Sequence, residues 1–165
     1  MFPAEKLQSV AVVVAGTDGV EAVKAALASS FDASTKITYY ETHDIIILPY
    51  IVQKVIKESK ASYVLAISVS IGEGNSAVNH AVLPALLQVG IASDTPVVPS
   101  IIQAASLAEL STQLPVYSKA WSASFASLAA PLKSSPLEAA KEVKVCPKTL
   151  NMPLTSPFTL QYSLY

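Results

Sequence analysis

The chain of 165 residues contains no arginine: all 11 of its basic residues are lysines, against 12 acidic residues. It therefore lacks the rigid, two-pronged donor that suits phosphate and carboxylate ligands best. Its formal net charge of -1 also gives it no excess of positive charge with which to neutralise a phosphate backbone. We therefore expect no nucleic-acid partner.

Cysteine occurs once, at Cys146, which excludes an internal disulfide and any metal site built from several thiolates. We expect no metal and no cofactor, and a reducing environment. Long apolar runs are missing too, because the runs at residues 10–15 and 45–52 are far shorter than the ~20 residues of a membrane-spanning helix. The first 14 residues do not resemble a signal or import sequence. The sequence therefore predicts no membrane insertion and an intracellular location, cytoplasmic or organellar.

Charged residues are scarce, at 14%, whereas 52% of the residues are hydrophobic. This composition excludes an intrinsically disordered chain, which is rich in charge and poor in apolar residues. A chain of this length buries about 70% of its unfolded surface in one core. We expect one α/β domain over residues 1–144, followed by an extended C-terminal arm over residues 145–165.

Short apolar runs alternate with segments of helical periodicity along most of the chain. We expect strands at residues 10–14, 37–40, 63–69 and 95–102. We expect helices at residues 20–31, 49–58, 78–89 and 117–132, with a separate short helix at 107–114. Strands that alternate with helices predict a parallel sheet with a layer of helices on each face.

The order of the strands follows from their composition. The runs at residues 10–14 and 63–69 are wholly apolar, as central strands covered on both faces must be. Pro99 cannot donate a hydrogen bond to a neighbouring strand, so its strand belongs at an edge. The strand of Tyr39 then forms the other edge. The sequence predicts a four-stranded parallel sheet in the order 2-1-3-4.

Several segments resemble the lumazine synthase family, whose members make 6,7-dimethyl-8-ribityllumazine in riboflavin biosynthesis. Leu48-Pro49 matches the end of a family Glu-Leu-Pro motif, and residues 62–68 resemble the strand that follows. The loop at residues 71–78 (Ile-Gly-Glu-Gly-Asn-Ser-Ala-Val) is similar to the family's substrate loop, and Thr95-Pro96-Val97 to its Ile-Pro-Val strand. The resemblance implies a three-layer fold and assembly as a pentamer or a larger shell.

The residues that carry the family's chemistry are replaced here. The proton-transferring histidine falls at Ala77, or at Ser76 in a shifted register, and neither is a base near neutral pH. The phosphate-binding arginine falls near Gln113, and the stacking aromatic falls within residues 15–18 (Ala-Gly-Thr-Asp). The resemblance therefore implies a non-catalytic structural subunit, or pseudoenzyme, of a homo-pentamer or larger complex. The alternatives are a lumazine synthase with substituted active-site residues and a protein that binds a flavin-like small molecule.

Several residues remain as site candidates. His80 lies about one helical turn beyond the histidine position and is the candidate catalytic residue. Gly72, Gly74 and Asn75 follow a buried strand and precede a helix, so their amides could bind an anion, and Lys119 could supply a charge in place of the arginine. The pair His43-Asp44 we interpret as a solvated turn.

The end of the chain has the alternation of a half-buried strand. Apolar side chains at every second position alternate with polar ones, and these apolar residues are Phe158, Leu160, Tyr162 and Leu164. A single strand is not stable alone, so it must add to the edge of a sheet. We predict that these residues form an interface with another subunit.

Overall fold

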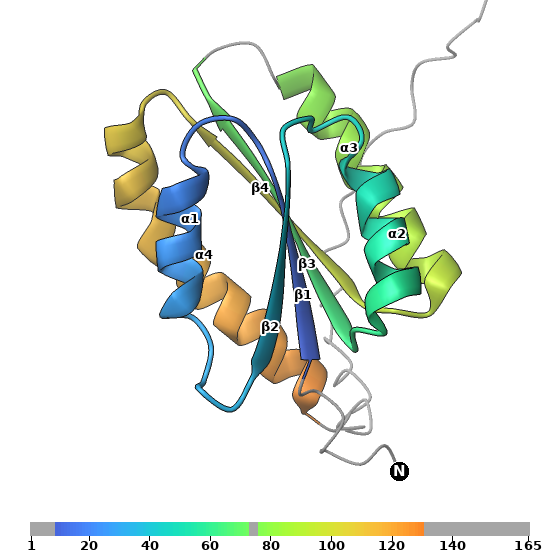
Figure 1. The fold of residues 1–165 in the computed structure, drawn as a ribbon. Coiled ribbons are helices and arrows are strands. Elements are labelled where there is room, and N and C mark those ends of the chain that lie inside the picture. The colour runs from blue at the N-terminus through green and yellow to red at the C-terminus, as the bar shows by residue number, and fades with distance from the viewer. Residues whose placement is uncertain (1–8, 73–75, 131–165) are drawn as a thin grey trace, which may run out of the picture. The chain divides into compact units, whose positions relative to one another are not determined.

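The computed structural model describes residues 9–72 and 76–130, which form eight helices and strands in one compact unit (Figure 1). Four parallel strands form one sheet in the order β2-β1-β3-β4. They are β1 (Ser9–Ala15), β2 (Lys36–Thr42), β3 (Tyr63–Ile71) and β4 (Val97–Ala104). The predicted order is confirmed, with Tyr39 in one edge strand and Pro99 in the other.

Helices cover both faces of this sheet. The helices α1 (Val20–Ala28) and α4 (Leu107–Ala129) lie on one face, and α2 (Leu48–Ser59) and α3 (Ser76–Ser93) lie on the other (Figure 1). Alternate residues of β1 serve the two sides: Val12 packs toward α1 and α4, whereas Val13 packs toward α2 and α3. Both are fully buried. This double burial explains why the central strands have no polar face.

The predicted break between two helices near residue 115 is wrong, because α4 continues through Pro115. A proline inside a helix removes one hydrogen bond and costs about 3 kcal/mol. The apolar side of α4 compensates, since Leu110, Leu114 and Trp121 are all buried against the sheet. The Trp121 indole N–H also donates a 2.9 Å hydrogen bond to Ser100 Oγ on β4.

Other boundaries differ by a few residues. The helix predicted at residues 20–31 ends at Ala28, where the Ser29 and Ser30 amides donate to the carbonyls of Ala26 and Leu27. Phe31 still packs against the core. The predicted domain boundary at residue 144 and the C-terminal arm lie outside the described residues.

Candidate functional site

The carboxyl end of the sheet holds a polar cavity between β1 and β3. The chain leaves β1 toward the face of α1 and leaves β3 toward the face of α3. Neighbouring parallel strands whose connections diverge in this way leave a crevice, where α/β proteins bind ligands. The cavity has a volume of about 210 Å³. Its lining comes from the ends of three strands and the start of α3: Gly16, Thr17, His43, Asp44, Ile45, Ile46, Val69, Ser70, Ile71 and Val78.

Gly16 allows the chain to pass close to β3 at this point. A Cβ atom on Gly16 would lie 2.7 Å from the Val69 carbonyl oxygen, which is closer than two such atoms can approach. The Gly16 amide also donates a 3.0 Å hydrogen bond to the Thr42 carbonyl. A side chain at this position would therefore push the loop after β1 away from the cavity.

The polar lining consists of exposed and buried groups. Thr17, His43 and Asp44 are exposed, whereas Ser70 is only 2% exposed. The Asp44 carboxylate accepts a 2.9 Å hydrogen bond from the Ile46 amide and so fixes the turn that leads into α2. The interpretation of His43-Asp44 as a turn agrees with this geometry, but both residues also line the cavity. In the sequence, Thr17 stood out only as one of the residues 15–18 that replace the family's stacking aromatic, and no motif pointed to Ser70.

A buried polar cluster joins β3 to α3 directly beside this cavity. The Ser68 hydroxyl donates to Asn79 Oδ1 at 2.9 Å, and Asn79 Nδ2 donates to Ser70 Oγ at 3.4 Å. All three side chains are at most 3% exposed. In the sequence, the two serines stand out because the rest of their strand is apolar. No pattern in the sequence points to Asn79.

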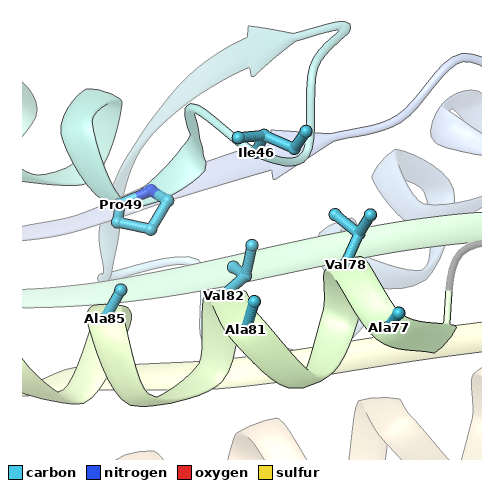
Figure 2. Close-up of a pocket in the computed structure, with 7 residues that line it drawn as sticks. All are labelled: Ile46, Pro49, Ala77, Val78, Ala81, Val82 and Ala85. Atoms are coloured by element: carbon cyan, nitrogen blue, oxygen red, sulfur yellow. The ribbon is translucent and has the colours of Figure 1, made fainter.

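A second and larger cavity, of about 440 Å³, lies between the start of α2 and the side of α3. Its lining is entirely aliphatic: Ile46, Pro49, Ala77, Val78, Ala81, Val82 and Ala85. Figure 2 shows Val78 and Val82 of α3 pointing toward the segment of Ile46 and Pro49. None of these side chains can accept or donate a proton. Ala77, the position that the resemblance assigns to the family's histidine, is among them.

The candidate residues do not meet at one place in the described part of the chain. His80 is exposed on α3 and lines neither cavity. Gly72 has a φ of 89°, but its amide already donates to the Ala104 carbonyl at 2.8 Å, so it is not directed at a ligand. Gly74 and Asn75 lie outside the described residues, as do Phe158, Leu160, Tyr162 and Leu164.

Lys119 lies far along α4 from the loop that it was expected to assist. Its neighbour Ser118 hydrogen-bonds to Ser30, which follows the last turn of α1 at the amino end of the sheet. Gly72, in contrast, follows the carboxyl end of β3. Lys119 therefore cannot supply a charge beside Gly72 in this fold.

An ion-pair cluster ties α1 to the edge strand β2. Lys24 Nζ lies 3.0 Å from a carboxylate oxygen of Glu41 and 3.0 Å from one of Glu21, and these two hydrogen bonds raise the lysine pKa. It also lies 4.8 Å from the ring centre of Tyr39. Burial raises the pKa of Tyr39 to about 12. This cluster lines neither of the two cavities, and through Lys24 and Glu41 it joins α1 to β2.

Residues 9–72 and 76–130 contain no group of three or more His, Cys, Asp or Glu side chains that could hold a metal ion. None of the four helices is long and apolar enough to cross a membrane. Comparison with known proteins found no matching family model and no matching curated protein.

Proposed function

We propose that this chain is a non-catalytic, lumazine-synthase-like assembly subunit of an oligomer or larger complex. The observation that carries the proposal is the aliphatic cavity around Ala77. Around Ala77, one of the two positions at which the resemblance expects a proton-transferring histidine, the cavity presents only alkyl groups. A general base typically supplies a factor of about 10²–10⁴ in rate, and this cavity offers none.

The position near the family's phosphate-binding arginine argues in the same direction. Gln113 is neutral, and its side-chain amide donates a 2.8 Å hydrogen bond to the Glu109 carboxylate. The negatively charged Glu109 carboxylate beside Gln113 would repel a phosphate bound there. The loss of an electrostatic clamp of this kind costs about 3 kcal/mol of transition-state stabilisation.

A turnover assay tests the loss of chemistry. The purified protein is mixed with the family's substrates, a ribityl-aminouracil and a four-carbon ketone phosphate, and the fluorescence of the lumazine product is followed. We expect no product. Turnover near an ordinary kcat of about 10 s⁻¹ would contradict the proposal and favour the alternative, a lumazine synthase with substituted residues.

Two variants make the assay sharper. Ala77→His should not create activity, because the chain has no arginine to hold the phosphate. His80→Ala should leave the fluorescence signal of the assay unchanged. If the wild-type protein does turn over and His80→Ala abolishes it, His80 is the catalytic residue of a divergent enzyme.

A second candidate function, the binding of a flavin-like small molecule, is favoured by the polar cavity at the carboxyl end of β1 and β3. Its hydroxyl, imidazole and carboxylate groups could orient a ligand. Its volume of about 210 Å³ is below the range of about 300–1,000 Å³ usual for small-molecule sites. Because the cavity is this small, binding of a small molecule is the second candidate function and assembly is the first.

Titration of the protein with riboflavin, followed by quenching of the flavin fluorescence, tests this second function. The variant Thr17→Val removes a hydroxyl that lines the cavity, and Thr112→Val removes an exposed hydroxyl on α4 as the matched control. Saturable quenching that Thr17→Val weakens and Thr112→Val does not would support binding. Absence of quenching would exclude it for this ligand.

A further inference from the structure

The aliphatic cavity owes its space to small side chains on one side of α3. Ala77, Ala81 and Ala85 follow one another at intervals of four residues, so they share a face of the helix. Their methyl groups leave an opening between α3 and the segment of Ile46 and Pro49 (Figure 2). The volume of about 440 Å³ lies within the range of about 300–1,000 Å³ that is usual for small-molecule sites.

The aliphatic cavity and the polar cavity are neighbours. Ile46 and Val78 line both of them, so one ligand can occupy both and stay in contact with the protein. Aliphatic walls favour an alkyl group, because they cannot replace the hydrogen bonds that a polar group makes with water. The polar cavity can take a polar group at the other end of such a ligand. The two cavities together therefore suit a molecule with an alkyl chain and one polar group.

Ser70 supplies a buried hydrogen-bond donor to the polar cavity. Its side chain is only 2% exposed, and its Oγ accepts the hydrogen bond from Asn79 Nδ2. The Ser70 hydroxyl proton has no acceptor within residues 9–72 and 76–130. A buried donor without an acceptor is costly. A ligand oxygen in the polar cavity would remove this cost, because Ser70 is part of the lining.

The charges of the lining select the kind of polar group. Asp44 lines the polar cavity, and its carboxylate can accept further hydrogen bonds besides the one from the Ile46 amide. Among residues 9–72 and 76–130, no lysine lines either cavity, and the chain has no arginine. A ligand carboxylate or phosphate would thus meet Asp44 without a compensating cation. An ammonium group cannot accept from Ser70, whereas a hydroxyl group can both accept and donate.

We infer that the two cavities together bind an uncharged alkyl alcohol. Its hydroxyl group accepts from Ser70 and donates to Asp44, and its chain lies in the aliphatic cavity. This site belongs to a single chain, so it does not depend on the proposed assembly function. It also differs from the flavin-like candidate, whose ligand would occupy the polar cavity alone.

Titration of the full chain with 1-octanol, followed by the NMR resonances of the backbone amides, tests the site. We expect saturable shifts of residues that line both cavities. 1-Hexanol should bind about tenfold more weakly, because each buried methylene group tightens binding about fourfold. Octanoate at about pH 7.5 has the same number of carbons but a negative charge. It should bind about fivefold more weakly than 1-octanol, because Asp44 repels it.

Variants locate the two ends of the ligand. Ala81→Leu fills the aliphatic cavity and should weaken 1-octanol binding at least about tenfold. Ala120→Leu is the matched control, since it changes an exposed alanine of α4 that lines neither cavity. Ser70→Ala should weaken binding about two- to tenfold. Asp44→Asn still accepts from the Ile46 amide, and it should bring the affinity for octanoate close to that for 1-octanol.

Circular dichroism checks that each variant is folded, and Ala77→Leu is a second variant that fills the aliphatic cavity. Absence of saturable shifts up to the solubility limit of 1-octanol would overturn the inference. Shifts confined to residues outside both cavities would overturn it too, as would equal binding by the variants Ala81→Leu and Ala120→Leu. If octanoate binds the wild-type chain as tightly as 1-octanol, or if Ser70→Ala binds 1-octanol unchanged, the assignment of the hydroxyl group is rejected.

Discussion

The Ser68 hydroxyl on β3 donates a 2.9 Å hydrogen bond to the side-chain oxygen of Asn79 on α3, in a region from which water is excluded. This bond fixes how α3 is rotated against the sheet. With Asn79 held inward, Val82 and Leu86 one and two turns later also point inward. Leu87 and Ile91 then point outward. The same hydrogen bond therefore supports the wall of the polar cavity and keeps Leu87 and Ile91 on the outward side of α3.

Replacing Asn79 should weaken the fold substantially. In Asn79→Ala the buried Ser68 hydroxyl loses its acceptor and Ser70 loses its donor. We expect the free energy of unfolding to fall by about 1–3 kcal/mol. Urea denaturation followed by the fluorescence of Trp121, the only tryptophan, measures it. Ser111→Ala removes an exposed hydroxyl that donates to the Leu107 carbonyl and should change stability by at most about 0.5 kcal/mol. Equal effects of the two variants would contradict the prediction.

Gly19 and Gly72 both have positive φ angles, but only Gly19 is crowded by another side chain. Substituting each with alanine therefore distinguishes the cost of backbone strain from the cost of a steric clash. Gly19 (φ 80°) precedes α1, and a Cβ there would clash with Leu110 Cδ2 on α4. At Gly72 (φ 89°), no atom of the described residues lies within 4 Å of the same position. Gly72→Ala should therefore cost only the backbone strain, about 1–2 kcal/mol. Gly19→Ala should cost a further ~1–3 kcal/mol from overpacking. Urea midpoints that fall equally in both variants would show that the Leu110 side chain simply moves aside.

The fold should lose stability as the pH rises above about 10. Burial raises the pKa of Tyr39 to about 12, and two carboxylates raise the pKa of Lys24. Groups with raised pKa values hold their protons more tightly when folded, so the native state is favoured fully below the ordinary values of 10.0 and 10.5. This advantage disappears as the pH rises toward the folded-state values. Urea denaturation at about pH 8 and about pH 11 measures the difference.

Tyr39→Phe should reduce this alkaline loss. The Tyr39 hydroxyl is buried and has no hydrogen-bond partner within residues 9–72 and 76–130, so its removal should leave stability at pH 7 unchanged or slightly higher. Tyr50→Phe is the matched control, because Tyr50 is 66% exposed. If Tyr39→Phe and the wild-type protein lose stability equally between the two pH values, the titration of Tyr39 does not contribute.

The C-terminal segment remains a separate prediction about assembly, because it lies outside the described residues. The alternation of Phe158, Leu160, Tyr162 and Leu164 predicts a strand that adds to the sheet of another subunit. Deleting residues 151–165 should then lower the native mass or the recovery of partner proteins. Unchanged mass and unchanged partner recovery would show that the arm does not hold the complex together.

The sequence by itself determined the sheet. Burial on both faces demands uninterrupted apolar runs, so residues 10–14 and 63–69 had to be central, and Pro99 had to lie at an edge. Apolar runs and a proline inside a strand are local properties that can be recognised in the sequence. The helices were also found from their periodicity, apart from the continuity of α4. Proline predicts a break locally, and only the packing of Leu114 and Trp121 on either side of Pro115 shows why the helix continues.

The tertiary structure alone decided which residues share a cavity. Thr17, His43 and Ser70 are separated by more than twenty residues in the chain, and they meet because parallel strands end at the same edge of the sheet. The same packing keeps Lys119 away from Gly72 and places Ala77 in an aliphatic cavity. It also exposes the uncharged side of α3. Periodicity gives the faces of a helix, but which face meets solvent is decided by the contacts that the rest of the chain makes with it.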